Sequence, residues 1–242
     1  MDNNQEKREA LLTTIMNRFS EVFREKAVLR GGMVLRLLEC PRLTNDLDYV
    51  FVPFKSKNDI KDSVVSTLRE IPGINLTYSL NSKCLRIVIT SGSIKVQVEV
   101  TVDKQCKTAV LTCAPLSKRY NQAVRTVQVM DLSVALSNKL SAWLDRRLMR
   151  DIYDIQFFLN MGVRPDLEIL EKRLKKPVYA RGVEPFPGKP PIPVQSFYDF
   201  LKAETLKLNE KQVSESLADI LPEMELTGLA MRIKAAITSK LV

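Results

Sequence analysis

A strictly alternating run at residues 94–102 constrains the fold most strongly. Its apolar side chains recur at every second position, which is the period of a β-strand with one buried face. Two further strand-like runs, 75–80 and 84–90, precede it, and Ser91-Gly92-Ser93 suits a hairpin turn between the last two strands. The first half of the chain is therefore expected to contain a sheet whose inward-facing residues in this run are Ile94, Val96, Val98 and Val100.

A second strand is predicted where Asp46-Leu-Asp-Tyr-Val-Phe-Val alternates polar and apolar residues before Pro53 stops it. Asp46 and Asp48 share the polar face of this strand. Glu99 lies on the polar face of the 94–102 run, so it is displayed like the two aspartates if the strands are neighbours.

Helical spacing dominates the remaining segments. Residues 4–27 form an amphipathic pattern, and residues 58–71 form another that begins at Asn58 as the N-cap. From Asp131 onward, leucines recur every four residues in a long helix or two helices in series. If this helix is unbroken, one polar stripe carries Lys139, Trp143, Arg146 and Arg150, although Trp143 is interpreted chiefly as a packing residue.

Half of the 12 prolines fall in residues 177–193, which are therefore expected to form an extended loop. Residues 195–208, 211–221 and 226–241 are read as closing helices. The predicted fold class is α+β, with a mixed-sheet catalytic domain at residues 1–125 and a helical domain at residues 126–242.

The residue inventory restricts the chemistry. The chain contains no histidine, and its four cysteines occur singly, so Ser/His and Cys/His pairs and zinc sites are excluded. Any catalysis must rest on carboxylates, lysine, arginine or metals. No secretory signal or membrane-length apolar run is present, so we expect a cytoplasmic protein. The net charge of +9 would attract polyanions, although a solvated basic surface explains it equally well.

Asp46 and Asp48 are spaced to hold a divalent cation, because adjacent carboxylates on one strand face relieve their repulsion by sharing a metal. With Glu99 they could bind Mg²⁺ or Mn²⁺ and activate an attacking hydroxyl. The alternative is an exposed strand end with solvated acids. Upstream, Gly31-Gly32 stands at a turn before a helix, where backbone amides can approach phosphate, or where the chain merely makes a tight turn.

Three motifs together resemble the AbiEii/AbiGii toxin family within the DNA polymerase β-like nucleotidyltransferases. They are Arg30-Gly-Gly-Met-Val-Leu-Arg-Leu, then Arg42-Leu-Thr-Asn-Asp-Leu-Asp-Tyr, then the run from Lys139 through Arg150-Asp-Ile-Tyr-Asp154. Their order makes the resemblance, over roughly residues 25 to 160, far more specific than any single motif.

The resemblance implies roles for individual residues. Asp46 and Asp48, with Glu99 as third carboxylate, would bind the metal and carry catalysis, while Gly31 and Gly32 would cradle phosphate. The nucleotide-binding residues of the second half would be Lys139, Arg150 and Asp151, although a helix-surface salt-bridge array is the simpler alternative for them. A serine often follows the first glycine in the wider superfamily, and here Gly32 replaces it.

The function implied is transfer of a nucleoside monophosphate from an NTP to a hydroxyl, on a tRNA 3′ end or a protein side chain, by a toxin of a bacterial toxin–antitoxin or phage-defence pair. A cognate antitoxin is then an expected partner. Two rivals remain open. One is a non-catalytic module of the same fold that binds nucleic acid or an antitoxin. The other is a nucleotidyltransferase acting on a small molecule.

Overall fold

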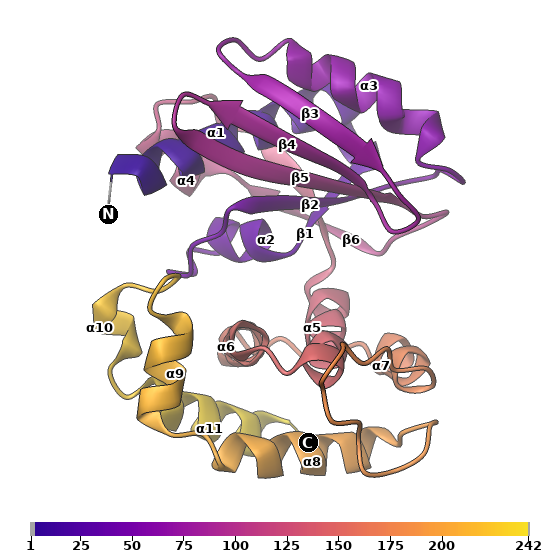
Figure 1. The fold of residues 1–242 in the computed structure, drawn as a ribbon, viewed down its shortest axis with the longest axis vertical. Helices are drawn as coiled ribbons and strands as arrows, with labels where there is room; N and C mark the ends of the chain where they lie inside the picture. The colour runs from indigo at the N-terminus through magenta and orange to yellow at the C-terminus, as the bar shows by residue number, and fades with distance from the viewer. Residues whose placement is uncertain (1–2, 242) are drawn as a thin grey trace. The chain divides into compact units, whose positions relative to one another are not determined.

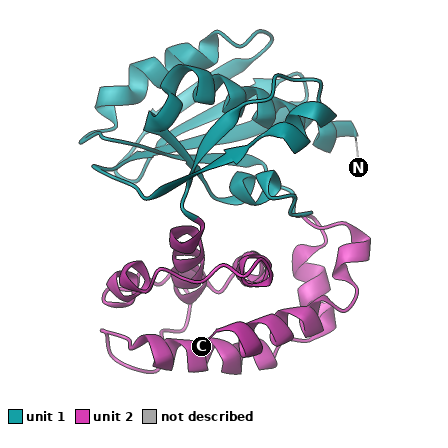
Figure 2. Ribbon diagram, turned by 180° about the vertical axis from the view of Figure 1, so that it is seen from behind, with its two compact units in different colours: residues 1–131 teal, residues 132–242 magenta. Residues whose placement is uncertain are grey.

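The computed structural model describes residues 3–241 and divides the chain into two compact units, Met1–Asp131 and Leu132–Val242. Figure 2 colours the two units separately. The division falls a few residues beyond the boundary expected after residue 125, because Thr126–Met130 forms a strand, β7, that pairs within the first unit. No helix among residues 3–241 is long and apolar enough to cross a membrane.

The first unit is built on a seven-stranded sheet in the order β3-β4-β5-β2-β1-β7-β6 (Figure 1). The pairs β2–β5 and β1–β7 are parallel and the others are antiparallel, so the sheet is mixed, as the sequence predicted. Its other strands are β1 (Ala27–Arg30), β2 (Asp46–Phe51), β3 (Asn75–Leu80), β4 (Leu85–Ser91), β5 (Ile94–Val102) and β6 (Thr108–Thr112).

The apolar face of β2 packs against helix α1 (Asn3–Phe23). Leu47, Tyr49 and Phe51 are buried there, and the ring of Phe19 on α1 lies 4.9 Å from that of Tyr49. Helix α3 (Asn58–Arg69) lies beside α1. Because side chains alternate along a strand, the carboxylates of β2 are directed to the opposite face of the sheet.

Several elements were not foreseen from the sequence. They include strands β6 and β7 and the short helix α4 (Ala114–Arg119), although Thr126-Val-Gln-Val in β7 does alternate polar and apolar residues. Strand β6 is an edge strand whose residues are exposed or half-buried, so no buried face imposes alternation on it. The N-cap prediction was wrong, because Asn58 is the first helical residue and Lys57 precedes it without a side-chain cap.

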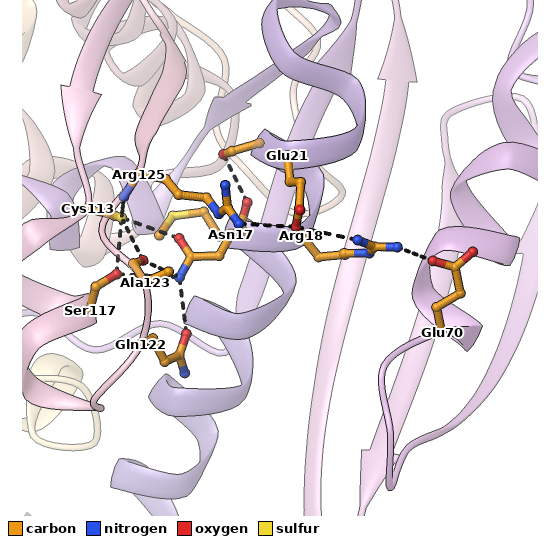
Figure 3. Close-up of polar contacts among 11 residues, drawn as sticks. Asn17, Arg18, Glu21, Glu70, Cys113, Ser117, Gln122, Ala123 and Arg125 are labelled. Atoms are coloured by element: carbon orange, nitrogen blue, oxygen red, sulfur yellow. Dashed lines mark hydrogen bonds and ion pairs between the residues drawn. The ribbon is translucent and has the colours of Figure 1, made fainter.

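A buried polar cluster fastens α1 to this unforeseen segment (Figure 3). The side-chain amide of Asn17 donates to Gln122 Oε1 at 3.2 Å and to the Ala123 carbonyl at 3.2 Å. The thiol of Cys113 donates to Asn17 Oδ1 at 3.3 Å and accepts from the backbone amide of Arg125 at 2.9 Å. Cys113 is thus a structural residue, and all four cysteines are free thiols.

Glu9 is a buried anchor between α1, α4 and the short helix α2 (Gly32–Leu37). Its carboxylate accepts from Arg36 Nε at 2.6 Å, from Tyr120 Oη at 2.6 Å and from Arg119 at 3.2 Å. Burial alone would raise the pKa of Glu9, but these hydrogen bonds and the two guanidinium charges outweigh it and lower the pKa.

Stability should therefore depend on the ionisation of Glu9. A pKa that is lower in the folded than in the unfolded state contributes stability above the unfolded value, and that stability is lost as pH falls through the folded value. In urea unfolding, Glu9→Gln is expected to lower the free energy of unfolding most at pH 7. Its deficit relative to wild type should shrink below the ordinary value of 4.5. Glu6→Gln, exposed on the same helix, is the control and should change stability by less than about 0.5 kcal/mol throughout. A deficit for Glu9→Gln that is constant with pH would contradict this account.

The second unit consists of helices. They are α5 (Leu132–Arg146), α6 (Met149–Asn160), α7 (Leu167–Leu174), α8 (Val194–Leu206), α9 (Glu210–Leu217), α10 (Glu223–Leu226) and α11 (Leu229–Lys240). The predicted helical second half is confirmed, although α7 was not foreseen. The leucines at 136, 140 and 144 are buried as expected, whereas Leu148 is exposed because it caps α6.

The helix after Asp131 is two helices in series, broken at Arg147 and Leu148. Arg147 adopts a positive φ of 52°, and its guanidinium lies 4.4 Å from the centre of the Trp143 ring. The break puts Arg150 on α6, so the single polar stripe expected for an unbroken helix does not exist. Trp143 is 3% exposed and packs against Phe197 and Phe200, which confirms it as a packing residue.

The proline-rich segment at residues 177–193 forms neither helix nor strand, as predicted. It is fastened to the end of α5, where the backbone amides of Val178 and Ala180 donate to Asp145 at 2.8 and 2.7 Å. The ring of Phe186 also packs edge-on against Phe200 at 5.2 Å. The segment is therefore an anchored part of the second unit.

Candidate functional site

The three carboxylates singled out in the sequence lie on one face of the sheet. Strands β2 and β5 are parallel neighbours, and their register places Asp48 opposite Glu99 and Asp46 opposite Gln97 (Figure 1). Paired residues on adjacent strands display their side chains on the same face. The adjacency on which the Glu99 prediction depended is thus confirmed. Asp46 is exposed, and Asp48 and Glu99 are half-buried.

Glu99 is already engaged by neighbours. Its Oε1 accepts hydrogen bonds from Arg86 Nε at 3.0 Å and Gln97 Nε2 at 2.8 Å, and forms an ion pair with a second nitrogen of Arg86 at 2.9 Å. Within residues 3–241, no three acidic or cysteine side chains are grouped so that they could hold a metal ion. Asp46 and Asp48 supply the hard oxygen donors that Mg²⁺ and Mn²⁺ prefer. The contacts of Glu99 with Arg86 and Gln97 are all made by Oε1, so coordination of a cation through that oxygen would compete with them.

Gly31 is in direct contact with Asp48. It joins β1 to α2 with φ = 76°, a conformation that side chains rarely adopt. A Cβ at this position would overlap the carboxylate of Asp48, whose Oδ2 occupies that space. Position 31 therefore requires glycine for two reasons, its positive φ and the nearby carboxylate of Asp48.

Gly31→Ala is expected to damage the site beyond its cost in backbone strain. Gly31 has φ = 76° and ψ = −151°, a backbone region that essentially only glycine adopts, so an alanine there costs about 1–3 kcal/mol in strain. The new methyl group must in addition displace the Asp48 carboxylate. The matched control is Gly92→Ala, because Gly92 has φ = 56° and a methyl group added there would meet no atom within 4 Å. Gly31→Ala should lose more stability than Gly92→Ala in urea unfolding, and only Gly31→Ala should lose nucleotidyl transfer, by about 100-fold or more. Equal activity in the two variants would show that Asp48 tolerates displacement.

Gly32 also stands in a crowded position. A Cβ there would lie 2.8 Å from Thr44 Oγ1 and 3.2 Å from a guanidinium nitrogen of Arg42. Thr44 is half-buried, and Arg42 is 7% exposed. Thr44 was not predicted to be a site residue, although it stands two residues before Asp46 in the motif Arg42-Leu-Thr-Asn-Asp46.

The second unit carries a buried charge network rather than a surface array. Asp151 and Asp154 have side chains that are 0% exposed, and that of Lys139 is 16% exposed. Lys139 Nζ lies 2.6 Å from Asp154 Oδ2 and 3.5 Å from Asp151 Oδ1. Arg146 forms a bidentate pair with Asp151 at 2.6 and 2.7 Å.

Ionisation of Asp151 is favoured by this network. Burial would raise the pKa of Asp151, but the hydrogen bonds from Arg146 and the charges of Lys139, Arg146 and Arg150 outweigh burial and lower it. Arg150 is itself exposed. The structure thus brings Lys139 and Asp151 together and adds Asp154, which the sequence motif contains but to which no role had been given.

Comparison with known proteins identifies the family. The model of the nucleotidyltransferase AbiEii toxin family, a type IV toxin–antitoxin system, matches residues 14–236. The chain belongs to this family. It is a nucleotidyltransferase, in agreement with the resemblance of its motifs. No curated protein matches it in sequence.

Solved structures agree on the fold of this AbiEii protein. MenT4, a nucleotidyltransferase toxin from Mycobacterium tuberculosis H37Rv, is similar with a TM-score of 0.62 and 16% identity, over 96% of this chain and 83% of that one. JHP933 from Helicobacter pylori is similar with a TM-score of 0.56 and 14% identity, over 98% and 92%. At these identities the likeness concerns the fold alone.

Proposed function

We propose that the protein transfers a nucleoside monophosphate from an NTP to a hydroxyl group, with release of pyrophosphate, as the toxin of a toxin–antitoxin pair. The observation that carries the proposal is the contact between the Asp48 carboxylate and Gly31, beside Asp46 and in register with Glu99. A turn without side chains adjoining paired carboxylates accommodates phosphates and their cation together.

Asp46 and Asp48 would hold the divalent cation, Mg²⁺ or Mn²⁺, through their carboxylate oxygens. When bound, the cation would neutralise the charge of the triphosphate and polarise the bond between the α-phosphate and the leaving pyrophosphate. Glu99 would be the third carboxylate of the catalytic set, and its Oε1 is oriented by the contacts with Arg86 and Gln97. The backbone at Gly31 and Gly32 contacts phosphate, because no side chain there keeps the ligand away.

Three charged residues of the helical unit are proposed to bind the nucleotide. Lys139 would contact the triphosphate as a point charge, and Asp151 would orient Lys139. Arg150, whose charge acts on Asp151, would be the third nucleotide-binding residue of this unit. The acceptor would be a tRNA 3′ end or a protein hydroxyl. The net charge of +9 favours tRNA, because a positively charged protein attracts a polyanion. We place the protein in the cytoplasm, with an antitoxin as its partner.

The test is incubation of the purified protein with each of the four α-³²P-labelled NTPs, Mg²⁺ and either total tRNA or a protein extract. Label on RNA or protein that is absent with Asp46→Ala/Asp48→Ala would establish the transfer and name the acceptor. With tRNA as acceptor, transfer should fall steeply as salt rises from 50 to about 200 mM. Absence of label with every NTP, together with partner binding that needs no Mg²⁺, would favour a non-catalytic binding module.

A further inference from the structure

Thr44 places a hydroxyl at the glycine turn of the site. Its Oγ1 lies 2.8 Å and its Cβ 3.0 Å from the point where residue 32 would carry a Cβ. Thr44 therefore occupies the space that a side chain at position 32 would need. The turn lacks a hydroxyl of its own, because both of its residues are glycine, and the chain just before β2 provides one instead.

The hydroxyl of Thr44 is only weakly engaged within the protein. Its Oγ1 donates to the Asp46 carbonyl and accepts from the Asp46 amide, and both contacts are 3.4 Å long. The usual lengths are about 2.7–2.8 Å for a hydroxyl donor and about 2.9–3.0 Å for an amide donor. Thr44 is half-buried, so one side of it is accessible to a ligand. A hydroxyl whose internal hydrogen bonds are long can rotate its hydrogen toward a closer acceptor at little cost in free energy.

The surroundings favour an anionic acceptor. A guanidinium nitrogen of Arg42 lies 3.2 Å from the same point at Gly32 and donates to the Leu43 carbonyl at 3.0 Å. Arg42 is 7% exposed, so its positive charge is weakly screened by water. A hydroxyl and a buried guanidinium thus converge on a turn that carries no side chain, which suits a phosphate oxygen.

We propose that Thr44 Oγ1 donates a hydrogen bond to a phosphate oxygen of the bound NTP at the Gly31–Gly32 turn. This inference rests on the proposed function, since it specifies how the same site holds its nucleotide. Thr44 would then supply the hydroxyl that Gly32 lacks.

The experiment measures the Mg²⁺-dependent affinity for each NTP by calorimetry, together with kcat and KM, for wild type, Thr44→Val and Thr44→Ser. Valine keeps the shape of threonine and removes the hydroxyl, so Thr44→Val should weaken NTP binding and lower kcat/KM by about 10- to 100-fold. Thr44→Ser retains the hydroxyl and should remain within about threefold of wild type. Thr108→Val, exposed at the edge strand, is the control for the substitution itself.

A swap separates phosphate binding from a local structural role. Gly32→Ser alone should be impaired, because its Cβ collides with Thr44. The double variant Gly32→Ser/Thr44→Gly removes that collision and places a hydroxyl on residue 32 instead of residue 44. It also removes the contacts of Thr44 with the backbone of Asp46. Recovery of NTP affinity in the swap, relative to Thr44→Gly alone, supports the proposal. If circular dichroism shows that the double variant does not fold, the comparison of Thr44→Val with Thr44→Ser tests the proposal.

Two results would overturn the inference in different ways. If wild type binds and transfers NTP and Thr44→Val does so equally well, the role of Thr44 is wrong and the proposed function stands. If wild type shows neither Mg²⁺-dependent NTP binding nor transfer, the proposed function fails and the role of Thr44 fails with it.

Discussion

Asp48→Asn is expected to reduce nucleotidyl transfer on the order of a thousandfold while changing the free energy of unfolding by less than about 1 kcal/mol. The side chain keeps its shape against Gly31, so the turn is preserved. The charge that attracts the cation is lost. Asp48 stands opposite Arg30 on β1 and opposite Glu99 on β5, so removal of its charge ends one attraction and one repulsion between directly paired residues. Activity should therefore fall much further than stability changes.

The measurement pairs initial rates of label transfer with urea unfolding at the same pH. The control is Asp62→Asn on α3, whose side chain is 87% exposed and which should change neither quantity appreciably. Transfer by Asp48→Asn above about a tenth of the wild-type rate would remove Asp48 from the metal site. A large loss of stability would instead show that the carboxylate is a structural acceptor.

The carboxylate face could be predicted because strand periodicity is local. Alternation alone put Asp46 and Asp48 on one face, and the same rule put Glu99 on the polar face of its strand. That the two strands are neighbours could not be read from alternation, since pairing depends on contacts between segments far apart in the chain. The pairing of Glu99 with Arg86 on β4 was unforeseen for the same reason.

The charged residues of the second unit show a different limit. Charges at helical spacing suggested a solvated stripe, but the chain breaks at Arg147 and turns Asp151 and Asp154 inward. No glycine or proline marks this break, and a non-glycine residue takes the positive φ there. Tertiary packing, including the contact of Arg147 with Trp143, outweighs local propensity at this point.

Lys139→Met is expected to lower the free energy of unfolding by about 3–5 kcal/mol, because it removes a positive charge that compensates a buried carboxylate. Lys139 Nζ is 2.6 Å from Asp154, whose side chain is 0% exposed. Asp151 is less affected, since it keeps the bidentate contact with Arg146. Lys172→Met, an exposed lysine on α7, is the control and should cost less than about 0.5 kcal/mol.

Loss of transfer in Lys139→Met cannot by itself assign a triphosphate contact, because the same change removes a structural charge. The double variant Lys139→Met/Asp154→Asn resolves this, since asparagine removes the negative charge that Lys139 had compensated and should recover most of the lost stability. If Lys139 contacts the triphosphate, this stable variant remains inactive and binds NTP at least about tenfold more weakly than wild type. If transfer returns together with stability, Lys139 acts only in the fold, and the nucleotide is held by other residues.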